Sequence, residues 1–249
     1  MTQRNDLEFH LDEARSLQAI AERSTYSTGV MGNAIHYCFR VLARHCPGEH
    51  VLELGPAEGL MTERLIGAGK QVTVVEGSSS FCDALRHRFA QIEVHCALFE
   101  EFETTARYDT VVLGHVLEHV ADPVAVLRRV RRWLRPHGHV FAAVPNARSL
   151  HRQAAVLMGL LPVETALNTQ DHLHGHRRVF TPEMLRALFP EASLRVETFG
   201  GYWLKPLSNG QLERDWNAAM IDAFMQLGER YPDIAGEIYV VACATPESN

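Results

Sequence analysis

Between residues 49 and 146 the sequence alternates short apolar runs with amphipathic stretches of helix length. The best-defined runs are VTVVE at 72–76, TVVLG at 110–114 and HVFAAV at 139–144. They are almost continuously apolar, whereas a strand with one face in water alternates, so we expect strands covered on both faces. Alternation of such strands with helices is typical of βαβ units. The sequence therefore predicts an α/β fold with a doubly wound, mostly parallel sheet.

Composition limits the partners of such a fold. The chain has 249 residues, 46% of them hydrophobic, which is enough for one large α/β domain. Its formal charge of -6, from 24 Lys and Arg against 30 Asp and Glu, predicts a small-molecule partner and no nucleic acid. Since we find no signal peptide and no membrane-length apolar run, we expect a cytoplasmic protein without a membrane partner. The five cysteines are scattered along the chain, which favours buried thiols over disulfides. The sequence leaves the oligomeric state open.

The run VLELGPAEG places Gly55 and Gly59 directly after a predicted strand and before a helix. A chain needs glycines there for tight turning and for close approach of its backbone to a ligand. Glu76 ends the next strand, seventeen positions beyond Gly59, where an α/β sheet presents a carboxylate to the hydroxyls of a ribose. Together the glycines and the carboxylate indicate a nucleoside site.

The residues from Glu53 to Gly59 read E-x-G-x-A-x-G, and no basic cradle for a pyrophosphate follows. This loop resembles the first motif, D/E-x-G-x-G-x-G, of the class I methyltransferases that use S-adenosyl-L-methionine (SAM). The resemblance covers roughly residues 49–146. It includes YDTVVLGHVLEHVADP, which looks like the fourth strand of that family and the following loop, and LRPHGHVFAAVPN, which is similar to the entry of its fifth strand. The resemblance implies a Rossmann-like methyltransferase fold and SAM as the cofactor.

The resemblance also implies which residues bind the cofactor. Two positions depart from the family pattern: Ala57 replaces the middle glycine of the loop, and Ala97 stands where many members place an aspartate near the adenine amine. Adenine is then expected to contact Phe99, Glu100 or a backbone N–H group. The expected cofactor residues are Glu53, Gly55, Ala57, Gly59, Glu76, Gly77, Leu98, Phe99, Gly114 and His115.

We interpret residues 1–249 as a single methyltransferase domain in three parts. Residues 1–47 carry two helical patterns, at 10–23 and 33–45, separated by the turn-like STYSTGVMG, and form an N-terminal helical lid. Residues 49–146 form the SAM-binding core. Residues 147–249 supply the helices and last strands on the acceptor side. Their expected elements are helices at 149–161, 181–189 and 213–230 and strands at 194–203 and 237–244.

His172, His174 and His176 alternate in the segment DHLHGH. In an extended strand this spacing puts three imidazoles on one side, which suits acid–base chemistry or a metal site. The alternative is a polar surface loop. Because an imidazole accepts a proton near neutral pH, we interpret His174 or His176 as a general base, with His172 as a third catalytic candidate and no metal.

A second pair, His115 and His119, is spaced by four and would share one face of a helix. Metal ligation by this pair is conceivable. The resemblance instead implies that His115 lies beside the methionine end of SAM, while Glu118 and His119 support the loop.

Other polar and aromatic residues are candidates for binding the acceptor. Arg148 and Arg152 follow the fifth predicted strand and would share a helix face; with Arg178 they could clamp a carboxylate or phosphate. Tyr202 and Trp203 could form a wall of the acceptor pocket. A solvated charged face and core aromatic residues are the respective alternatives.

The histidines favour O-methylation of a small-molecule or sugar-derived hydroxyl or carboxylate. N-methylation of a small amine is the alternative within the enzyme class. A non-catalytic SAM- or nucleoside-binding regulatory module is the alternative of another class, and the His, Arg and aromatic content after Asn146 argues against it. Ala57 disfavours an NAD-dependent enzyme.

Overall fold

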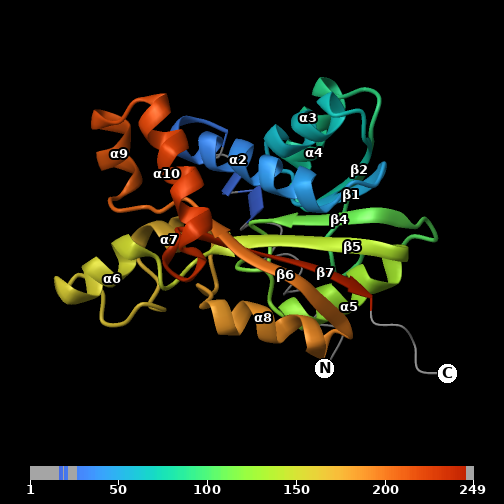
Figure 1. Ribbon diagram of the computed structural model, residues 1–249. Helices are drawn as coiled ribbons and strands as arrows, with labels where there is room; N and C mark the ends of the chain where they lie inside the picture. The colour runs from blue at the N-terminus through green and yellow to red at the C-terminus, as the bar shows by residue number, and fades with distance from the viewer. Residues whose placement is uncertain (1–16, 19, 22–26, 245–249) are drawn as a thin grey trace, which may run out of the picture.

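The computed structural model describes residues 17–18, 20–21 and 27–244 (Figure 1). Within these residues seven strands form one sheet in the order β3-β2-β1-β4-β5-β7-β6. The pairs from β3 to β5 are parallel, and β7 is antiparallel to both of its neighbours. The strands are β1 (His50–Leu54), β2 (Gln71–Glu76), β3 (Glu93–Cys96), β4 (Tyr108–Gly114), β5 (Leu134–Pro145), β6 (Leu194–Tyr202) and β7 (Glu237–Ala244).

Helices cover both faces of this sheet. One face packs against α2, α3, α4 and α10, and the other against α5 and α8, each with its own apolar core cluster (Figure 1). Val111, Val112 and Leu113 of β4 are consequently inaccessible to solvent. The predicted doubly wound, mostly parallel sheet is confirmed. These helices are α2 (Gly29–His45), α3 (Leu60–Gly67), α4 (Ser79–Arg88), α5 (Pro123–Trp133), α8 (Pro182–Glu191) and α10 (Ala218–Arg230).

Capping residues set the start of the two helices on the second face. Asp122 accepts a hydrogen bond from the Ala125 backbone N–H at 2.9 Å, and Thr181 accepts one from Met184 at 3.2 Å. In each helix proline occupies the first turn, where no N–H donor is required. The predicted cap at Thr181 is confirmed.

Three predicted element boundaries are wrong. The helix expected at 213–230 is two helices, α9 (Asn209–Asp215) and α10, because Trp216 is extended with ψ 134° and Asn217 caps the second helix. The helix expected at 149–161 is α6 (Leu150–Leu157), which ends just before Gly159 at φ 71°. α2 begins at Gly29, inside the predicted loop at 24–32.

Of the helical pattern predicted at 10–23, Leu17, Gln18, Ile20 and Ala21 are helical, and the remainder lies outside the described residues. All five cysteines are free thiols, and all but Cys96 are buried. Among the described residues, no helix combines the length and apolar character needed to cross a bilayer.

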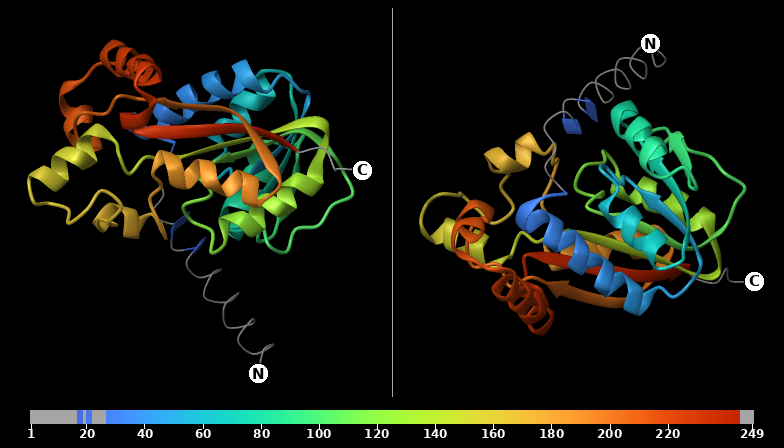
Figure 2. Two further views of the ribbon diagram at one scale, coloured as in Figure 1. Left: turned by 60° about the horizontal axis from the view of Figure 1, so that its bottom comes forward. Right: turned by 90° about the horizontal axis from the view of Figure 1, so that it is seen from above.

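The segment after β5 forms a separate layer at one end of the sheet. Figure 2 shows α6 and the short α7 (Thr169–Leu173) beyond the carboxyl end of β5. Open α/β sheets bind ligands at the carboxyl ends of their parallel strands. This layer therefore lies where a second substrate is expected.

Candidate active site

A pocket lies at the carboxyl ends of the parallel strands. Its wall combines the loop after β1, the ends of β2 and β4, and the segments that follow β3 and β4. Apolar side chains of the N-terminal region complete it. Nearly all the residues expected to bind the cofactor line this pocket: Glu53, Gly55, Ala57, Glu76, Gly77, Leu98, Phe99, Gly114 and His115.

The loop after β1 turns through left-handed backbone conformations. Gly55, Ala57 and Gly59 have φ angles of 64°, 47° and 78°. Glycine adopts such angles freely, whereas an L-residue loses roughly 1 kcal/mol or more. At Ala57 a hydrogen bond from its backbone N–H to Glu76 Oε2, at 3.2 Å, offsets part of this cost. The alanine thus keeps the loop geometry that the glycine motif predicts.

Glu76 ends β2 and is only 5% exposed. Its Oε1 accepts a hydrogen bond from the Ser78 backbone N–H at 2.8 Å, and its Oε2 accepts the one from Ala57. Burial raises the pKa of this carboxyl group, while the backbone N–H groups of Ser78, Ala57 and Gly77 lower it. A carboxylate has about four acceptor positions, so acceptor capacity remains for a ligand that donates a hydrogen bond.

A second buried carboxyl group, Glu53, lies near the end of β1 and accepts a hydrogen bond from Thr62 Oγ1 at 2.7 Å. Burial raises its pKa to about 8, and the charge of Glu76 adds to the rise. A cationic ligand group would favour the ionised form of Glu53. The ammonium of SAM is such a group.

Gly59 lies outside the residues that line the pocket, and its cofactor contact stays a prediction. It precedes the first turn of α3, and a Cβ atom there would lie 2.7 Å from Leu85 and 2.8 Å from Phe89. Gly59 therefore permits close packing of α3 against α4.

The N-terminal region covers part of the pocket. Leu17, Ile20, Met31 and Ile35 all line it. A Cβ atom on Gly77 would lie 2.6 Å from the Leu17 side chain, so Leu17 packs directly on the loop after β2. Closure of these residues as a lid stays a prediction.

At the opposite end of the pocket, His115 lies between two buried carboxyl groups. Its Nδ1 is 3.4 Å from Glu118 Oε1, and its Nε2 is 3.7 Å from Glu237 Oε2. Burial opposes a charge on this ring, but Glu237 and Glu118 together raise the pKa of His115 to about 9. At neutral pH this imidazole therefore carries a proton and does not act as a base.

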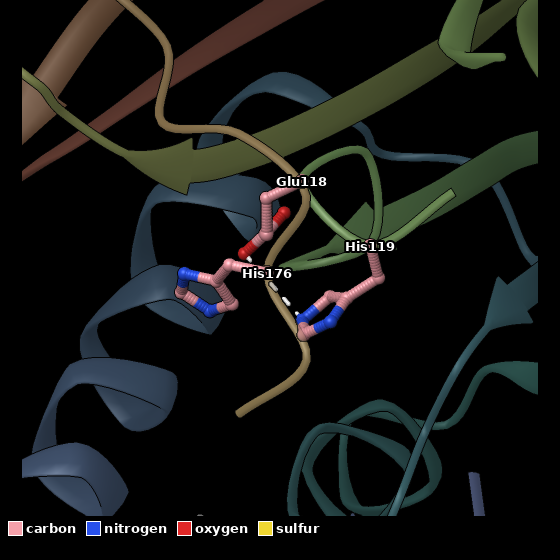
Figure 3. Close-up of side chains that lie close together, drawn as sticks. All are labelled: Glu118, His119 and His176. Carbon is pink, nitrogen blue, oxygen red and sulfur yellow. Dashed lines mark ion pairs between the residues drawn. The ribbon is translucent and has the colours of Figure 1, made fainter. Parts of the chain in front are cut away.

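His119 and His176 lie beside Glu118 (Figure 3). His119 lines the pocket; its Nε2 is 3.9 Å from Glu118 Oε1, and its ring meets that of His176 edge to face with centroids 4.9 Å apart. The helix predicted to carry His115 and His119 is wrong, since both lie in a turn after β4 and His115 has φ 58°. The turn brings His119 together with a distant histidine.

His176 pairs with Asp171, whose Oδ1 is 3.4 Å from His176 Nδ1. Asp171 is itself fixed by Arg152 at 3.1 Å and by the backbone N–H of Asn168 at 2.8 Å. Burial opposes the charge on Asp171, but these partners hold its pKa well below the usual range. Asp171 is therefore an anion that orients His176.

Comparison with known proteins identifies the family. The sequence model of the family described as "Methyltransferase domain" matches residues 30–198, more than half of the chain. The chain belongs to the class I SAM-dependent methyltransferases. It is an enzyme of that class and its cofactor is SAM, as the glycine loop and Glu76 predicted.

The methyltransferase is 30% identical to a protein named ubiquinone biosynthesis O-methyltransferase from Aeromonas salmonicida, over 65% of this chain and 69% of the relative. It is 26% identical to the protein of that name from Xanthomonas oryzae pv. oryzae, over 81% of this chain and 87% of the relative. Among solved structures it is similar to the 1,6-didemethyltoxoflavin-N1-methyltransferase of Burkholderia thailandensis, with a TM-score of 0.63 and 15% identity. This match covers 98% of this chain and 90% of that structure. The CcbJ methyltransferase of Streptomyces caelestis is also similar, with a TM-score of 0.62 and 16% sequence identity. The match covers 92% of this chain and 98% of that structure. These structures establish the fold.

In the methyltransferase the segment DHLHGH is not extended. Residues up to Leu173 belong to α7, and a turn follows in which Gly175 has φ 76°. The prediction of three imidazoles on one side of a strand is therefore wrong. His172 is exposed, the His174 ring lies 6.0 Å from that of His176, and His176 alone of the three enters the group with His119.

The arginines predicted to clamp the substrate bind the protein itself. Arg148 precedes α6, so it shares no helix face with Arg152, and it pairs with Glu183 at 2.8 Å. Arg152 is buried against Asp171. Arg178 donates hydrogen bonds to the backbone oxygens of Leu117, Val120 and Ala121.

Tyr202 and Trp203 were predicted to line the acceptor pocket. The structure buries them in the core, 0% and 1% exposed, and neither lines the pocket. Close packing explains this placement, because a Cβ atom on Gly228 of α10 would lie 2.2 Å from the Trp203 backbone.

Sequence reasoning missed the functional grouping of Glu118 and His119 with His176. Their proximity follows from contacts between the turn after β4 and the segment after α7, including a hydrogen bond from the Arg177 backbone N–H to the Glu118 backbone oxygen at 2.8 Å. No spacing rule predicts contacts between segments so far apart in sequence.

Proposed function

We propose that this methyltransferase transfers the methyl group of SAM to a hydroxyl oxygen of a small molecule. The observation that carries the proposal is the placement of His119 in the pocket wall, with Glu118 and His176 beside it. Imidazole and carboxylate groups suit a hydroxyl acceptor, which must lose a proton as it is methylated.

In this proposal the cofactor lies along the pocket from Glu76 to His115. The remaining acceptor capacity of Glu76 receives the ribose hydroxyls, and the apolar side chains of Leu98 and Phe99 pack on adenine. Gly55, Ala57 and Gly77 give the ligand close access to the backbone. Glu53, Gly114 and His115 lie at the methionine end.

The acceptor enters beside His119, next to the methionine end. SAM supplies an electrophilic methyl group when bound. The protein orients the acceptor oxygen for in-line displacement, excludes water from the reacting methyl group and promotes loss of the hydroxyl proton. His176 stays in the proposal as an acceptor-side residue, whereas His172, His174, Arg148, Arg152, Arg178, Tyr202 and Trp203 do not.

Relatives support oxygen as the acceptor atom, because those at 26–30% identity are named O-methyltransferases. The absence of a basic surface excess, at a formal charge of -6, supports a small-molecule partner without nucleic acid. A cytoplasmic location is part of the same proposal.

The proposal is tested by measuring S-adenosylhomocysteine (SAH) formation from SAM with phenols, catechols and sugar alcohols, each beside an amine of matched shape. Methylation of a hydroxyl series, reduced at least tenfold by His119→Ala with SAH affinity retained, is the expected result. Turnover with the amines alone would replace the proposal by N-methylation. SAH binding without turnover on any acceptor would favour a regulatory module.

A further inference from the structure

We propose that Glu118, His119 and His176 bind a divalent transition-metal ion, and that this ion holds the acceptor oxygen. The potential donor atoms of the three side chains, one carboxylate oxygen and two imidazole nitrogens, all lie within 4.8 Å of one another (Figure 3). Two residues come from the turn after β4 and the third from the segment after α7. The ion site thus joins the cofactor core to the acceptor-side layer.

The geometry requires only a small contraction. Zinc-to-ligand bonds are about 2.1 Å, so donors of a tetrahedral site lie roughly 3.4 Å apart. The largest separation between the donors, 4.8 Å, exceeds this spacing by about 1.4 Å, so each donor must move inward by about an ångström or less.

Glu118 supplies the independent sign of a ligand. Its side chain is 0% exposed; Oε1 faces the charged ring of His115, whereas among the described residues Oε2 has neither a hydrogen-bond donor nor an ion-pair partner. The nearest nitrogens, His115 Nδ1 and His119 Nε2, lie at 3.4 and 3.9 Å from Oε1. A buried carboxylate is normally paired or bound to a metal.

Both histidines have the outer partners typical of metal ligands. Asp171 faces Nδ1 of His176, which leaves Nε2 of that ring to bind an ion. The ring of His119 makes a hydrogen bond with the Gly175 backbone. Such partners fix ring orientation and tautomer, and the carboxylate–histidine–metal arrangement recurs in protein sites.

The donor set selects the class of metal. Two imidazoles and one carboxylate suit Zn²⁺, Co²⁺, Mn²⁺ or Fe²⁺, whereas Mg²⁺ and Ca²⁺ prefer sites made of oxygen alone. Three protein ligands also leave at least one coordination position open. An acceptor oxygen can occupy that position.

The ion has a defined place in the reaction, which rests on the proposed function for the identity of the acceptor. His119 lines the cofactor pocket, so a hydroxyl bound to the ion lies beside the methionine end of SAM. Coordination lowers the hydroxyl pKa and the proton leaves to water. The oxygen then forms a bond to the methyl carbon, the S–CH₃ bond breaks and its electron pair stays on sulfur in SAH.

The test is direct metal binding, without SAM or acceptor. The full-length protein, freed of metal with a chelator, is titrated with Co²⁺ and followed by visible absorption and calorimetry, then competed with Zn²⁺. One Co²⁺ per chain, displaced by Zn²⁺, is expected. No saturable binding to the parent protein would overturn the proposal.

Variants locate the ion. His119→Ala and His176→Ala should each weaken Co²⁺ binding at least tenfold, and Asp171→Asn about tenfold. His87→Ala, which removes an exposed imidazole on α4, is the matched control and should leave binding unchanged. Loss in His172→Ala or His174→Ala, with binding retained in His176→Ala, would overturn the site in favour of surface coordination.

Folding and cofactor binding are monitored in the same variants by circular dichroism and SAH calorimetry. SAH affinity should stay within about threefold in His176→Ala. Metal binding with no hydroxyl turnover would count against the proposed function and leave the ion site standing. If the protein binds no Co²⁺ and a chelator leaves hydroxyl turnover unchanged, the ion site is overturned and the proposed function stands.

Discussion

At the cofactor end of the pocket, Ala57 and Glu76 come from neighbouring parallel strands and their hydrogen bond spans 19 positions of sequence. At the acceptor end, His119 and His176 come from separate layers, and Arg178 reaches back across 57 to 61 positions to the backbone after β4. The first end is built within one βαβ unit. The second depends on docking of a long segment onto the sheet.

This difference predicts separable effects of mutation. Changes at the cofactor end alter groups that face SAM, so they should reduce affinity for it directly. Changes in the contacts that dock the acceptor-side segment should reduce turnover while cofactor affinity persists. Four predictions test that separation, in order of expected effect.

The largest effect is expected for Glu76→Ala. Loss of a carboxylate that is proposed to accept hydrogen bonds from the ribose, each worth about 1.5–3 kcal/mol, should weaken SAH binding on the order of 100-fold or more. Calorimetric titration measures the change, and Asp83→Ala on the exposed surface of α4 is the control. Parent-like affinity would remove Glu76 from the cofactor site.

Arg178→Ala should separate the two ends most clearly. Its guanidinium donates to three backbone oxygens of the turn that carries His119, so its loss should displace that residue. We expect turnover to fall by about 30-fold, which corresponds to the net loss of one to two charge-assisted hydrogen bonds. SAH affinity should stay within threefold of the parent value.

Steady-state kinetics and calorimetry of the same preparation check this prediction, with the exposed Arg107→Ala as control. An equal loss of SAH affinity and turnover would show that the two ends are not independent.

Leu17→Asp tests the cover of the cofactor. Leu17 packs on Gly77, so a carboxylate there should weaken SAH binding by about tenfold through lost apolar burial. Limited proteolysis gives a second readout: SAH should slow N-terminal cleavage in the parent protein and have less effect in the variant. Identical cleavage rates with and without SAH would argue against a lid.

The smallest effect concerns pH and Glu53. Burial raises its folded pKa to about 8 from the ordinary value of 4.5, so the folded chain holds this proton more tightly than the unfolded chain. The associated stability is complete below pH 4.5 and is lost as pH rises to about 8.

Glu53→Gln removes this titration. Between pH 5.5 and 8.5 the melting temperature of the ligand-free parent should fall by at least about 3 °C more than that of the variant. The reason is that a difference of one pKa unit between the folded and unfolded chain changes the free energy of unfolding by about 1.4 kcal/mol. Scanning fluorimetry measures both slopes. Parallel slopes would mean that Glu53 is ionised in the folded protein.

The sequence by itself determined the parallel sheet, the loop after β1 and Glu76. Continuous apolar runs specify strands buried on both faces, and the turn between a strand and its helix is specified by adjacent residues. Even Ala57 did not disturb this inference, because its left-handed backbone is supported by Glu76 from the next strand.

Only the tertiary structure decided the acceptor side. Arg152, Arg178, Tyr202 and Trp203 have the side chains of binding residues, yet their partners are buried protein groups. Conversely, Glu118 and His119 gained a third partner, His176, only because α7 and the turn after it dock beside β4. Periodicity and spacing describe neighbours along the chain, whereas these contacts depend on how distant segments pack.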